Sequence, residues 1–149
     1  MERSDKDVPA LPEKLRLEIV TPDRLLFSGD VDEASVPGVE GYLGILPGHA
    51  PLLSELKVGE VTYRQGEKRT HLFCSWGFLE VLPDRVSVLA EVAERPEEID
   101  VNRAQQAKER AEKRLKSKDR DIDYTRAQIA LERALIRLQL AGKHGRQGK

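Results

Sequence analysis

Residues 85–115 read RVSVLAEVAERPEEIDVNRAQQAKERAEKRL, and their pattern changes at Pro96. Before Pro96, apolar and polar residues alternate, as they do in a half-buried strand. From Glu97 to Ala141 the chain contains neither Gly nor Pro and is rich in Ala, Glu, Lys, Arg, Gln and Leu, which are strong helix formers. The pattern therefore predicts a strand-forming half followed by a helix-forming half.

Short runs with period-two alternation fill the half before Pro96, and turn-forming pairs such as Gln65-Gly66 and Pro83-Asp84 separate neighbouring runs. Many short strands without helical patterns between them are typical of an antiparallel β-sandwich or a flattened barrel. We expect this domain to cover residues 15–95. The predicted strands are residues 15–20, 24–29, 31–36, 59–65, 69–75, 78–83 and 85–92.

The helix-forming half, residues 96–141, is interrupted by the polar run SKDRD at residues 117–121. Because this run has no apolar residue to anchor a packed face, it predicts a bend between two antiparallel helices. Gly142 suits the position just after a helix end. We expect the N-terminal extension, residues 1–14, and the tail, residues 142–149, to be disordered.

The second predicted helix repeats the first 23 residues later, with the pattern D-x-x-R-A-Q-x-A-x-E-R-A-x-x-R-L starting at Asp100 and again at Asp123. Small residues of each copy form a seam along which two helices can approach closely. Such a seam buries little area and the bend has no Gly or Pro, so we expect an equilibrium between a folded-back and an extended hairpin. The seam consists of Ala104, Ala107, Ala111 and Leu115, with their counterparts Ala127, Ala130, Ala134 and Leu138.

A line of arginines runs beside each seam, since positions i, i+7 and i+11 fall within roughly 40° of one another around a helix. Arg133 and Arg137 repel each other unless solvent, a carboxylate or a bound anion compensates. A solvated surface is one interpretation of this line and an anion site is the other. Arg103 favours the anion site, because a cation in the first turn of a helix opposes the helix dipole.

The composition excludes several classes of function. In 149 residues, 25 Lys and Arg nearly balance 26 Asp and Glu, so no overall field attracts nucleic acid or an anionic membrane. No apolar run approaches the roughly 20 residues that span a bilayer, and residues 1–14 lack the apolar stretch of a signal peptide. We therefore expect a cytosolic protein without direct membrane insertion, which partners can hold at a membrane.

Neither an enzyme nor a metal site is predicted. The lone Cys74 lies in an apolar run and is interpreted as a buried small hydrophobe. His71 and Cys74 leave opposite faces of a strand and cannot easily share a metal. His49 has no nucleophile or acidic partner at a recognised spacing, so a contact role is favoured over a catalytic one. Trp76 is interpreted as core.

The run GYLGILPGHAPLL from Gly41, preceded by TPDRLLFSG and followed by GEVTY, SWGFLEV and RVSVLAE, resembles the epsilon subunit of bacterial ATP synthases over residues 15–141. The resemblance implies a sandwich of about ten strands followed by two helices. It implies a non-catalytic stalk subunit of a proton-translocating F-type complex, peripheral on the cytoplasmic face of the inner membrane. Its implied partners are the gamma subunit, the c-ring and the alpha/beta subunits of the catalytic head.

The same resemblance assigns roles to individual residues, with no required cofactor and ATP as a possible regulatory ligand. The segment from Ile99 to Ala104 fits the I/L-D-x-x-R-A pattern that binds ATP in some members. In the extended hairpin, basic residues would inhibit hydrolysis by contacting acidic surfaces of alpha/beta. The implied ATP set is Glu94, Ile99, Asp100, Arg103, Ala104, Arg133 and Arg137; the gamma and c-ring set is Gly38, Val39, Glu40, Gly41 and His49; the inhibitory set is Arg110, Arg114, Arg126 and Arg133.

A stand-alone soluble ATP sensor is the alternative from another class of function. Such a sensor would bind ATP without a gamma partner, whereas a stalk subunit would co-purify with gamma.

Overall fold

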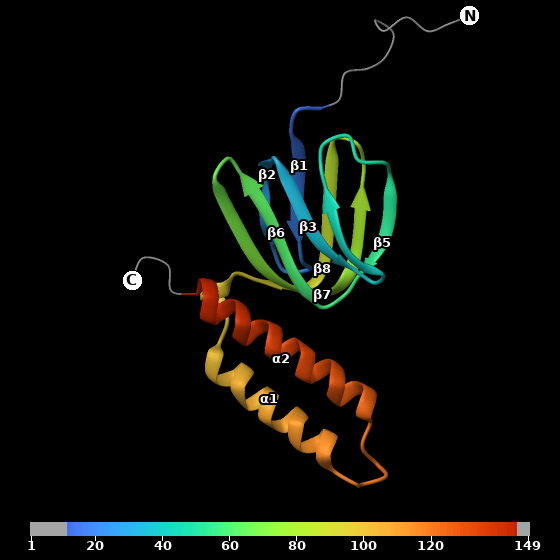
Figure 1. Ribbon diagram of the computed structural model, residues 1–149, viewed down its shortest axis with the longest axis vertical. Helices are drawn as coiled ribbons and strands as arrows, with labels where there is room; N and C mark the ends of the chain where they lie inside the picture. Colours follow the sequence, from blue (N-terminus) through green and yellow to red (C-terminus); the bar gives the residue numbers. More distant parts are fainter. Residues whose placement is uncertain (1–11, 146–149) are drawn as a thin grey trace, which may run out of the picture.

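The computed structural model describes residues 12–145 and places a β-sandwich above a hairpin of two helices (Figure 1). The predicted sandwich followed by a helical hairpin is confirmed. The expectations of disorder for residues 1–11 and 146–149 lie outside the described residues.

Eight strands form the sandwich within the described residues, and five of them begin and end within two residues of a predicted strand. Two runs were missed, β4 (Gly41–Ile45) and β5 (Leu52–Leu56), because glycines and a single short apolar stretch hide their alternation. The other strands are β1 (Leu15–Val20), β2 (Leu25–Val31), β3 (Glu33–Gly38), β6 (Gly59–Gln65), β7 (Lys68–Val81) and β8 (Arg85–Glu94).

Strand β7 joins the two layers of the sandwich and spans two of the predicted strands. Its first half pairs with β6 and its second half with β5, while β8 lies along both. The backbone bends at Trp76 and Gly77, which have φ of 53° and 137°. A Cβ on Gly77 would lie 1.9 Å from the carbonyl oxygen of Leu89, so only glycine fits there. The described structure has eight strands, whereas the resemblance implied about ten. Part of this difference arises because β7 is one continuous strand.

The strand order is β2-β1-β8-β7-β5-β3-β4, with β6 between β3 and β7. All pairings are antiparallel except that of β1 with β8, which is parallel. Side chains from both layers fill the core between them, and Cys74 is fully buried there, as predicted. The largest buried members are Leu15, Leu17, Ile19, Ile45, Leu56, Leu72 and Leu79.

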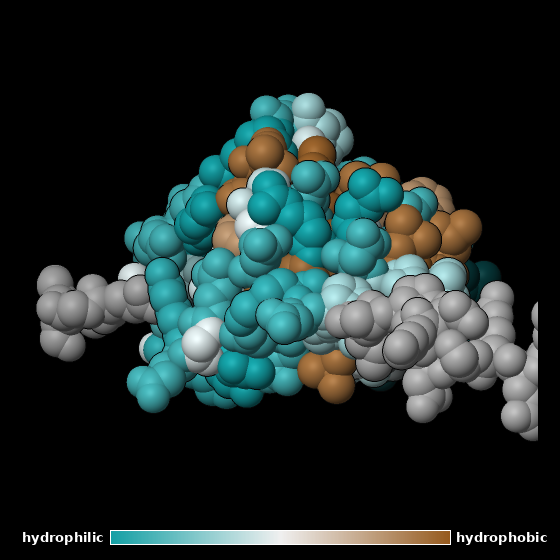
Figure 2. Space-filling model, turned by 90° about the horizontal axis from the view of Figure 1, so that it is seen from above, coloured by the Kyte–Doolittle hydropathy of each residue, from teal (hydrophilic) through white to brown (hydrophobic). Residues whose placement is uncertain are grey.

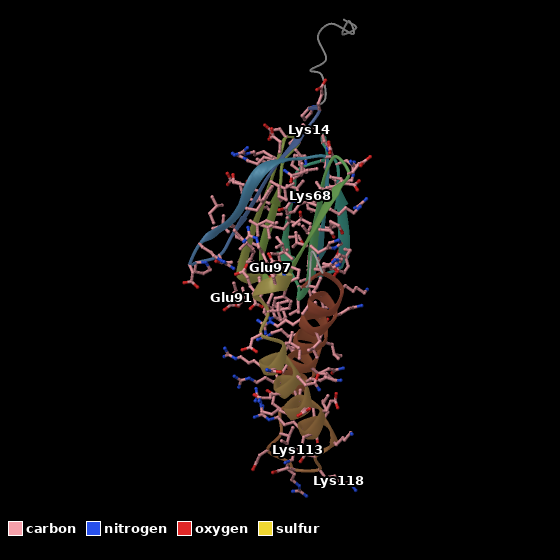
Figure 3. All side chains as sticks on the ribbon, turned by 90° about the vertical axis from the view of Figure 1, so that its left-hand side faces the viewer. Lys14, Lys68, Glu91, Glu97, Lys113 and Lys118 are labelled. Atoms are coloured by element: carbon pink, nitrogen blue, oxygen red, sulfur yellow. The ribbon has the colours of Figure 1, made fainter. Side chains whose placement is uncertain are left out.

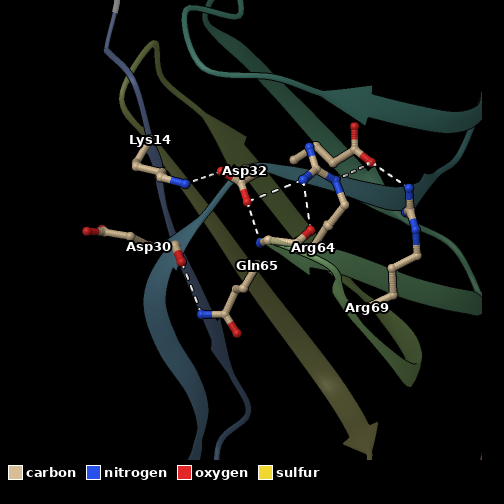
Figure 4. A network of polar contacts seen from close by, with 8 residues as sticks. Lys14, Asp30, Asp32, Arg64, Gln65 and Arg69 are labelled. Carbon is tan, nitrogen blue, oxygen red and sulfur yellow. Dashed lines mark hydrogen bonds and ion pairs between the residues drawn. The ribbon is translucent and has the colours of Figure 1, made fainter.

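A polar network closes the end of the sandwich away from the helices (Figure 4). Asp32 contacts Lys14, accepts the backbone N–H of Gly66 at 2.6 Å and lies 3.4 Å from the Arg64 guanidinium. The hydrogen bond from Lys14, followed by that from Gly66, lowers the pKa of the Asp32 carboxyl below its ordinary value. Glu33 continues the network to Arg64 and Arg69.

Helices α1 (Val101–Lys116) and α2 (Tyr124–His144) follow the 3-10 turn η2 (Pro96–Glu98). The two halves of the repeat start identically: the Asp100 side chain accepts the N–H of Arg103, and the Asp123 side chain accepts the N–H of Arg126, both at 3.1 Å. These are N-caps, which each supply about 1 kcal/mol. The seam alanines with the least exposure are Ala104, Ala111, Ala127 and Ala134.

Helix α2 does not end at Gly142, so the prediction of a disordered tail from residue 142 is wrong for residues 142–144. The helix continues to His144, because Leu140 and Ala141 are buried against the sandwich and the His144 ring stacks on His71. This tertiary contact outweighs the cost of one exposed glycine in a helix, which is about 1 kcal/mol.

The end of α2 holds the hairpin to the sandwich through a small second core. Leu140 packs with Val58, Phe73 and Ile99, and Ile136 lies beside them. Burying one such leucine contributes about 1.5–3 kcal/mol. The hairpin is therefore attached mainly at one end, whereas α1 lies on the far side of α2 from the sandwich (Figure 1). In the described part of the chain, neither helix is long and apolar enough to cross a membrane.

Candidate functional site

A cleft of about 490 Å³ lies where the helical hairpin meets the sandwich. Three segments form its walls: the end of β8 with η2, the first half of α1, which follows directly in the sequence, and the distant middle of α2. We call it the arginine cleft, because four arginines line it. Its lining residues are Glu94, Glu98, Asp100, Arg103, Ala104, Ala107, Arg110, Ala130, Arg133, Ala134 and Arg137.

Small side chains make room for this cleft. Ala107 and Ala130 belong to the seam, and both face the cleft and remain partly exposed. Had these positions carried leucines, their side chains would fill the space between the helices. The seam therefore serves two purposes, since it packs the helices closely and leaves a hollow beside them.

Arg137 is fixed in place at the inner wall of the cleft. Its Nε donates to the Glu94 carboxylate at 2.7 Å, and its guanidinium lies 4.4 Å from the centre of the Phe73 ring. These two contacts hold the guanidinium in one orientation. A ligand that binds Arg137 therefore restricts the side chain less than it would restrict a free arginine. Glu94 and Arg137 lie 43 residues apart in the chain, so only the docked hairpin brings them together.

Arg133 carries an unpartnered group in the same cleft. Its Nε is shielded from solvent and has no hydrogen-bond partner within residues 12–145. A buried donor without an acceptor costs about 1–3 kcal/mol. An anionic ligand that accepts from Arg133 would recover this free energy, and this makes Arg133 the strongest local indication of a ligand.

The carboxylates of the cleft are already occupied. Asp100 caps α1, and Glu98 lies 2.7 Å from Arg24. Burial raises the pKa of the Glu98 carboxyl, but the hydrogen bonds from Arg24 and from the Arg95 backbone outweigh it and lower the pKa below its ordinary value. Four arginines face three carboxylates, of which two are engaged elsewhere. The cleft is therefore suited to an anion, and guanidinium groups bind phosphate oxygens in pairs.

Most of the predicted ATP set meets in this cleft. Glu94, Asp100, Arg103, Ala104, Arg133 and Arg137 line it, as does Arg110, which the resemblance placed in the inhibitory set instead. Ile99 does not line it, since its side chain is 7% exposed and packs in the small second core. Its role in the hexapeptide is to anchor the start of α1. The sequence did contain a signal that Arg110 belongs with the ATP set, because Arg110 is equivalent to Arg133 in the repeat.

The predicted gamma and c-ring set is not brought together. Gly38, Val39, Glu40 and Gly41 form the turn between β3 and β4, on the side of the sandwich that faces α2. His49 lies in the loop before β5, next to Gly48, whose N–H donates to Pro83 in the β7–β8 turn. That turn is at the end of the sandwich away from the helices (Figure 1). These residues therefore belong to two surfaces.

The predicted inhibitory set is divided too. Arg114 and Arg126 are exposed on the hairpin, while Arg110 and Arg133 line the cleft. Charged side chains cover the hairpin to its tip, where Lys113 and Lys118 lie farthest from the sandwich (Figure 3). In the folded-back hairpin, Arg133 is partly buried in the cleft, whereas Arg110, Arg114 and Arg126 are exposed.

A row of apolar side chains crosses the outer face of the β2-β1-β8-β7-β5 layer. The patterns in the sequence did not predict this row. Val20 pairs with Leu25 on one side and with Leu89 on the other, and Leu89 pairs with Phe78. Leu53 lies two residues from Glu55, the β5 partner of Phe78, and so on the same face. We call these five residues the apolar row.

The row is exposed and lies beside a shallow hollow of about 630 Å³. Leu53 is 76%, Phe78 61% and Leu89 51% exposed. Seen from above, hydrophobic residues gather mainly on one side of the sandwich, and much of the visible remainder is hydrophilic (Figure 2). Exposed apolar patches of this kind are typical of protein or membrane interaction sites and of ligand-binding grooves. The signal in the sequence was the adjacent pair Phe78-Leu79, because neighbouring strand residues cannot both face the core.

Comparisons with known proteins match nearly all of the described chain. The family model for the beta-sandwich domain of the ATP synthase delta/epsilon chain matches residues 14–96, and that for its long alpha-helix domain matches residues 97–142. The ATP synthase epsilon chain of Koribacter versatilis is 54% identical over 107 residues, covering 72% of this chain and 75% of that protein. That of Geobacter sulfurreducens is 48% identical over 140 residues, covering 92% of this chain and all of that protein.

A solved structure agrees with these matches. A chain of the Euglena gracilis mitochondrial ATP synthase, in a structure of OSCP, F1 and the c-ring, superposes with a TM-score of 0.78 and 26% identity. The superposition covers 97% of this chain and 89% of that one.

Proposed function

Because this chain belongs to the delta/epsilon chain family of ATP synthase and is thus a non-catalytic subunit of that complex, we propose that its hairpin is a regulatory element controlled by ATP. ATP bound in the arginine cleft would hold the hairpin folded back against the sandwich. Release of the hairpin would let its basic residues reach the catalytic head and inhibit ATP hydrolysis. The chain itself requires no cofactor in this proposal.

The unpartnered Arg133 Nε is the observation that carries the proposal. Arg133 lines a cleft with three further arginines and an excess of positive charge, so the triphosphate of ATP matches the cleft in charge and in hydrogen-bond acceptors. The cleft walls come from α1, α2 and the end of β8. A ligand that contacts all three binds only the folded-back state and shifts the population toward it by its differential affinity.

The repeat provides matched controls for this proposal. Arg103 and Arg126 are equivalent in the two copies, as are Arg114 and Arg137, yet only Arg103 and Arg137 line the cleft. Arg103 and Arg137 therefore each have a counterpart of the same type, at the same helical position, outside the cleft, whereas Arg110 and Arg133 are each other's counterparts and both line it.

We expect Arg103→Ala, Arg133→Ala and Arg137→Ala each to weaken ATP binding to the purified chain tenfold or more, since a hydrogen bond to a charged group is worth about 1.5–3 kcal/mol. Arg126→Ala and Arg114→Ala should leave the affinity within about twofold of the original. Isothermal titration of ATP measures both sets. Equal losses in the two sets would show a general charge effect and contradict a site in the cleft.

Within the complex, we propose that the apolar row docks on the gamma subunit and that the turn formed by residues 38–41 faces the c-ring. The exposed area of Leu53, Phe78 and Leu89 supports the first contact, because such a row is costly to leave in water. The subunit would then lie peripherally on the cytoplasmic face of the cell inner membrane, joined to the rotor of a proton-translocating complex. The inhibitory contact with alpha/beta would involve Arg110, Arg114, Arg126 and Arg133.

A further inference from the structure

Two imidazoles and a carboxylate meet where the last turn of α2 touches the sandwich, outside the arginine cleft. Glu60 of β6, His71 of β7 and His144 of α2 each offer one ligand atom, and these atoms all lie within 4.8 Å of one another. The His71 Nδ1 contacts the Glu60 carboxylate, and the His71 and His144 rings stack with centroids 3.8 Å apart. All three side chains are partly buried.

Both the sandwich and the hairpin position this cluster. His71 pairs with Thr62 across the β6–β7 ladder, and Glu60 lies two residues from Thr62, so Glu60 and His71 share one face. His144 reaches that face because Leu140 and Ala141 are buried one turn earlier in α2. The cluster therefore exists only when the hairpin is folded back.

We propose that Glu60, His71 and His144 form a binding site for a late first-row divalent cation such as Zn²⁺. Two imidazole nitrogens and one carboxylate oxygen are a donor set that zinc prefers, with a fourth position left to water. Ligand atoms on one tetrahedral zinc lie roughly 3.4 Å apart, given bonds of 2.0–2.1 Å. The two ring planes lie 9° from parallel, so both rings would turn out of their stack to direct their nitrogens at one ion.

The charges at the site suit a cation. Imidazoles bind a metal in their neutral form, so the three ligands together would present a formal charge of minus one to a divalent ion. The side chains of His71 and Glu60 retain 22% and 34% exposure, so an ion can enter from solvent.

The site would act as a clasp, since one ligand comes from the hairpin and two come from the sandwich. A bound ion stabilises only the folded-back state, because the extended hairpin carries His144 away from the other two ligands. This inference goes beyond the proposed function, since metal binding requires no ATP and none of the cleft arginines.

The experiment uses the full chain without a histidine tag, because a tag would bind the same ions. Co²⁺ is titrated into the chain first, and its binding is monitored by the visible absorption of tetrahedral cobalt with nitrogen and oxygen ligands. Zn²⁺ is then added to displace the bound Co²⁺. His144→Gln and Glu60→Gln remove one ligand each from different elements. His49→Gln is the matched control, since His49 follows Gly48, whose N–H donates to Pro83 in the β7–β8 turn, away from the cluster.

We expect the unaltered chain and His49→Gln to bind one Co²⁺ per chain with the same spectrum. Loss of a residue that only supports a metal ligand weakens metal binding by about 10–100-fold. We expect His144→Gln and Glu60→Gln, which each remove a ligand, to weaken Co²⁺ binding by at least as much. Circular dichroism verifies that the variants are folded. Absence of the tetrahedral spectrum in the unaltered chain, or equal binding by His144→Gln, would overturn the proposal.

Hydrogen exchange of α2 provides a second measurement that surface binding would not change. Zn²⁺ should slow exchange in the last two turns of α2 in the unaltered chain and in Arg133→Ala, but not in His144→Gln. Slowing in Arg133→Ala separates the metal site from the arginine cleft, since that variant is expected to lose ATP binding. Unchanged exchange in the unaltered chain would rule out the clasp.

Discussion

Arg114 and Arg137 occupy the same position in the two copies of the helical repeat, yet their surroundings differ completely. Arg114 is exposed on α1, whereas Arg137 is held by Glu94 and lies over Phe73. The difference arises because α2 packs against the sandwich, whereas α1 lies on the far side of α2 from it. At the scale of the residue, docking rather than local sequence decides which arginines can serve a ligand.

Cys74 illustrates the same dependence on surroundings, and its thiol should be inert in the folded chain. Burial raises the pKa of the Cys74 thiol to about 12, opposed only in part by a hydrogen bond from the Gly59 backbone. Below pH 9 the folded chain then holds roughly a thousandfold less thiolate than an ordinary thiol. We expect iodoacetamide to modify Cys74 at pH 8.5 only after unfolding, as followed by mass spectrometry with and without urea. Rapid modification of the folded chain would contradict this burial.

At the scale of the element, the two helices carry interchangeable starts, which explains why the repeat could be identified from sequence. Asp100 and Asp123 have nearly the same backbone conformation, with φ and ψ of −79° and 99° and of −84° and 96°. Each side chain accepts one N–H that would otherwise lack a partner. The local interaction is the same, although only α1 begins beside the arginine cleft.

We expect Asp100→Ala and Asp123→Ala to lower the free energy of unfolding of the hairpin by about 1 kcal/mol each, the usual cost of losing an N-cap. Hydrogen exchange in the first turn of each helix measures this cost. Asp100→Asn and Asp123→Asn serve as controls, because asparagine caps equally well. Should the asparagine variants be as unstable as the alanine variants, the cap would not be the cause.

At the scale of the whole molecule, two surfaces on different faces divide the proposed work. The apolar row lies on the outer face of the sandwich, and the hairpin lies beneath the sandwich (Figure 1). This separation allows the sandwich to remain docked while the hairpin moves. Each surface can therefore be altered without the other.

We expect Leu53→Asp and Phe78→Asp to abolish co-purification with gamma while the isolated chain stays folded, since both side chains are more than 60% exposed. Leu46→Asp, at an exposed leucine in the loop that contains His49, is the control. Loss of gamma in Leu46→Asp alone would place the contact at that loop instead and reject the apolar row.

Deleting the residues after Glu98 should raise ATP hydrolysis by the reconstituted catalytic head without loss of assembly. The deletion also uncovers Phe73, which is fully buried beneath the hairpin. A second variant therefore keeps both helices and reverses the outward charges through Arg114→Glu and Arg126→Glu. Hydrolysis should rise in both variants, measured against the unaltered subunit at equal occupancy. Unchanged hydrolysis in both would show that the hairpin is not inhibitory.

The sequence alone predicted much of the architecture, because the relevant signals are local. Alternation over six residues predicts a strand, and a cap three residues before its N–H partner predicts a helix start, as at Asp100. The end of α2 at His144 was mispredicted since Gly142 signals a helix end locally. Gly142 stays within the helix because the residues around it contact Phe73 and His71, which lie far away in the sequence and belong to no local pattern.

The sequence by itself determined the two halves of the chain, the repeat, the caps, the small-residue seam and most of the residues that line the cleft. Only the tertiary structure decided which of two equivalent arginines faces the cleft, which apolar residues form an exposed row, and that Glu60, His71 and His144 meet. The reason is physical: periodicity specifies the face of an element on which a residue lies. What covers that face depends on strand register and on the docking of α2, and both are set by contacts between residues far apart in the chain.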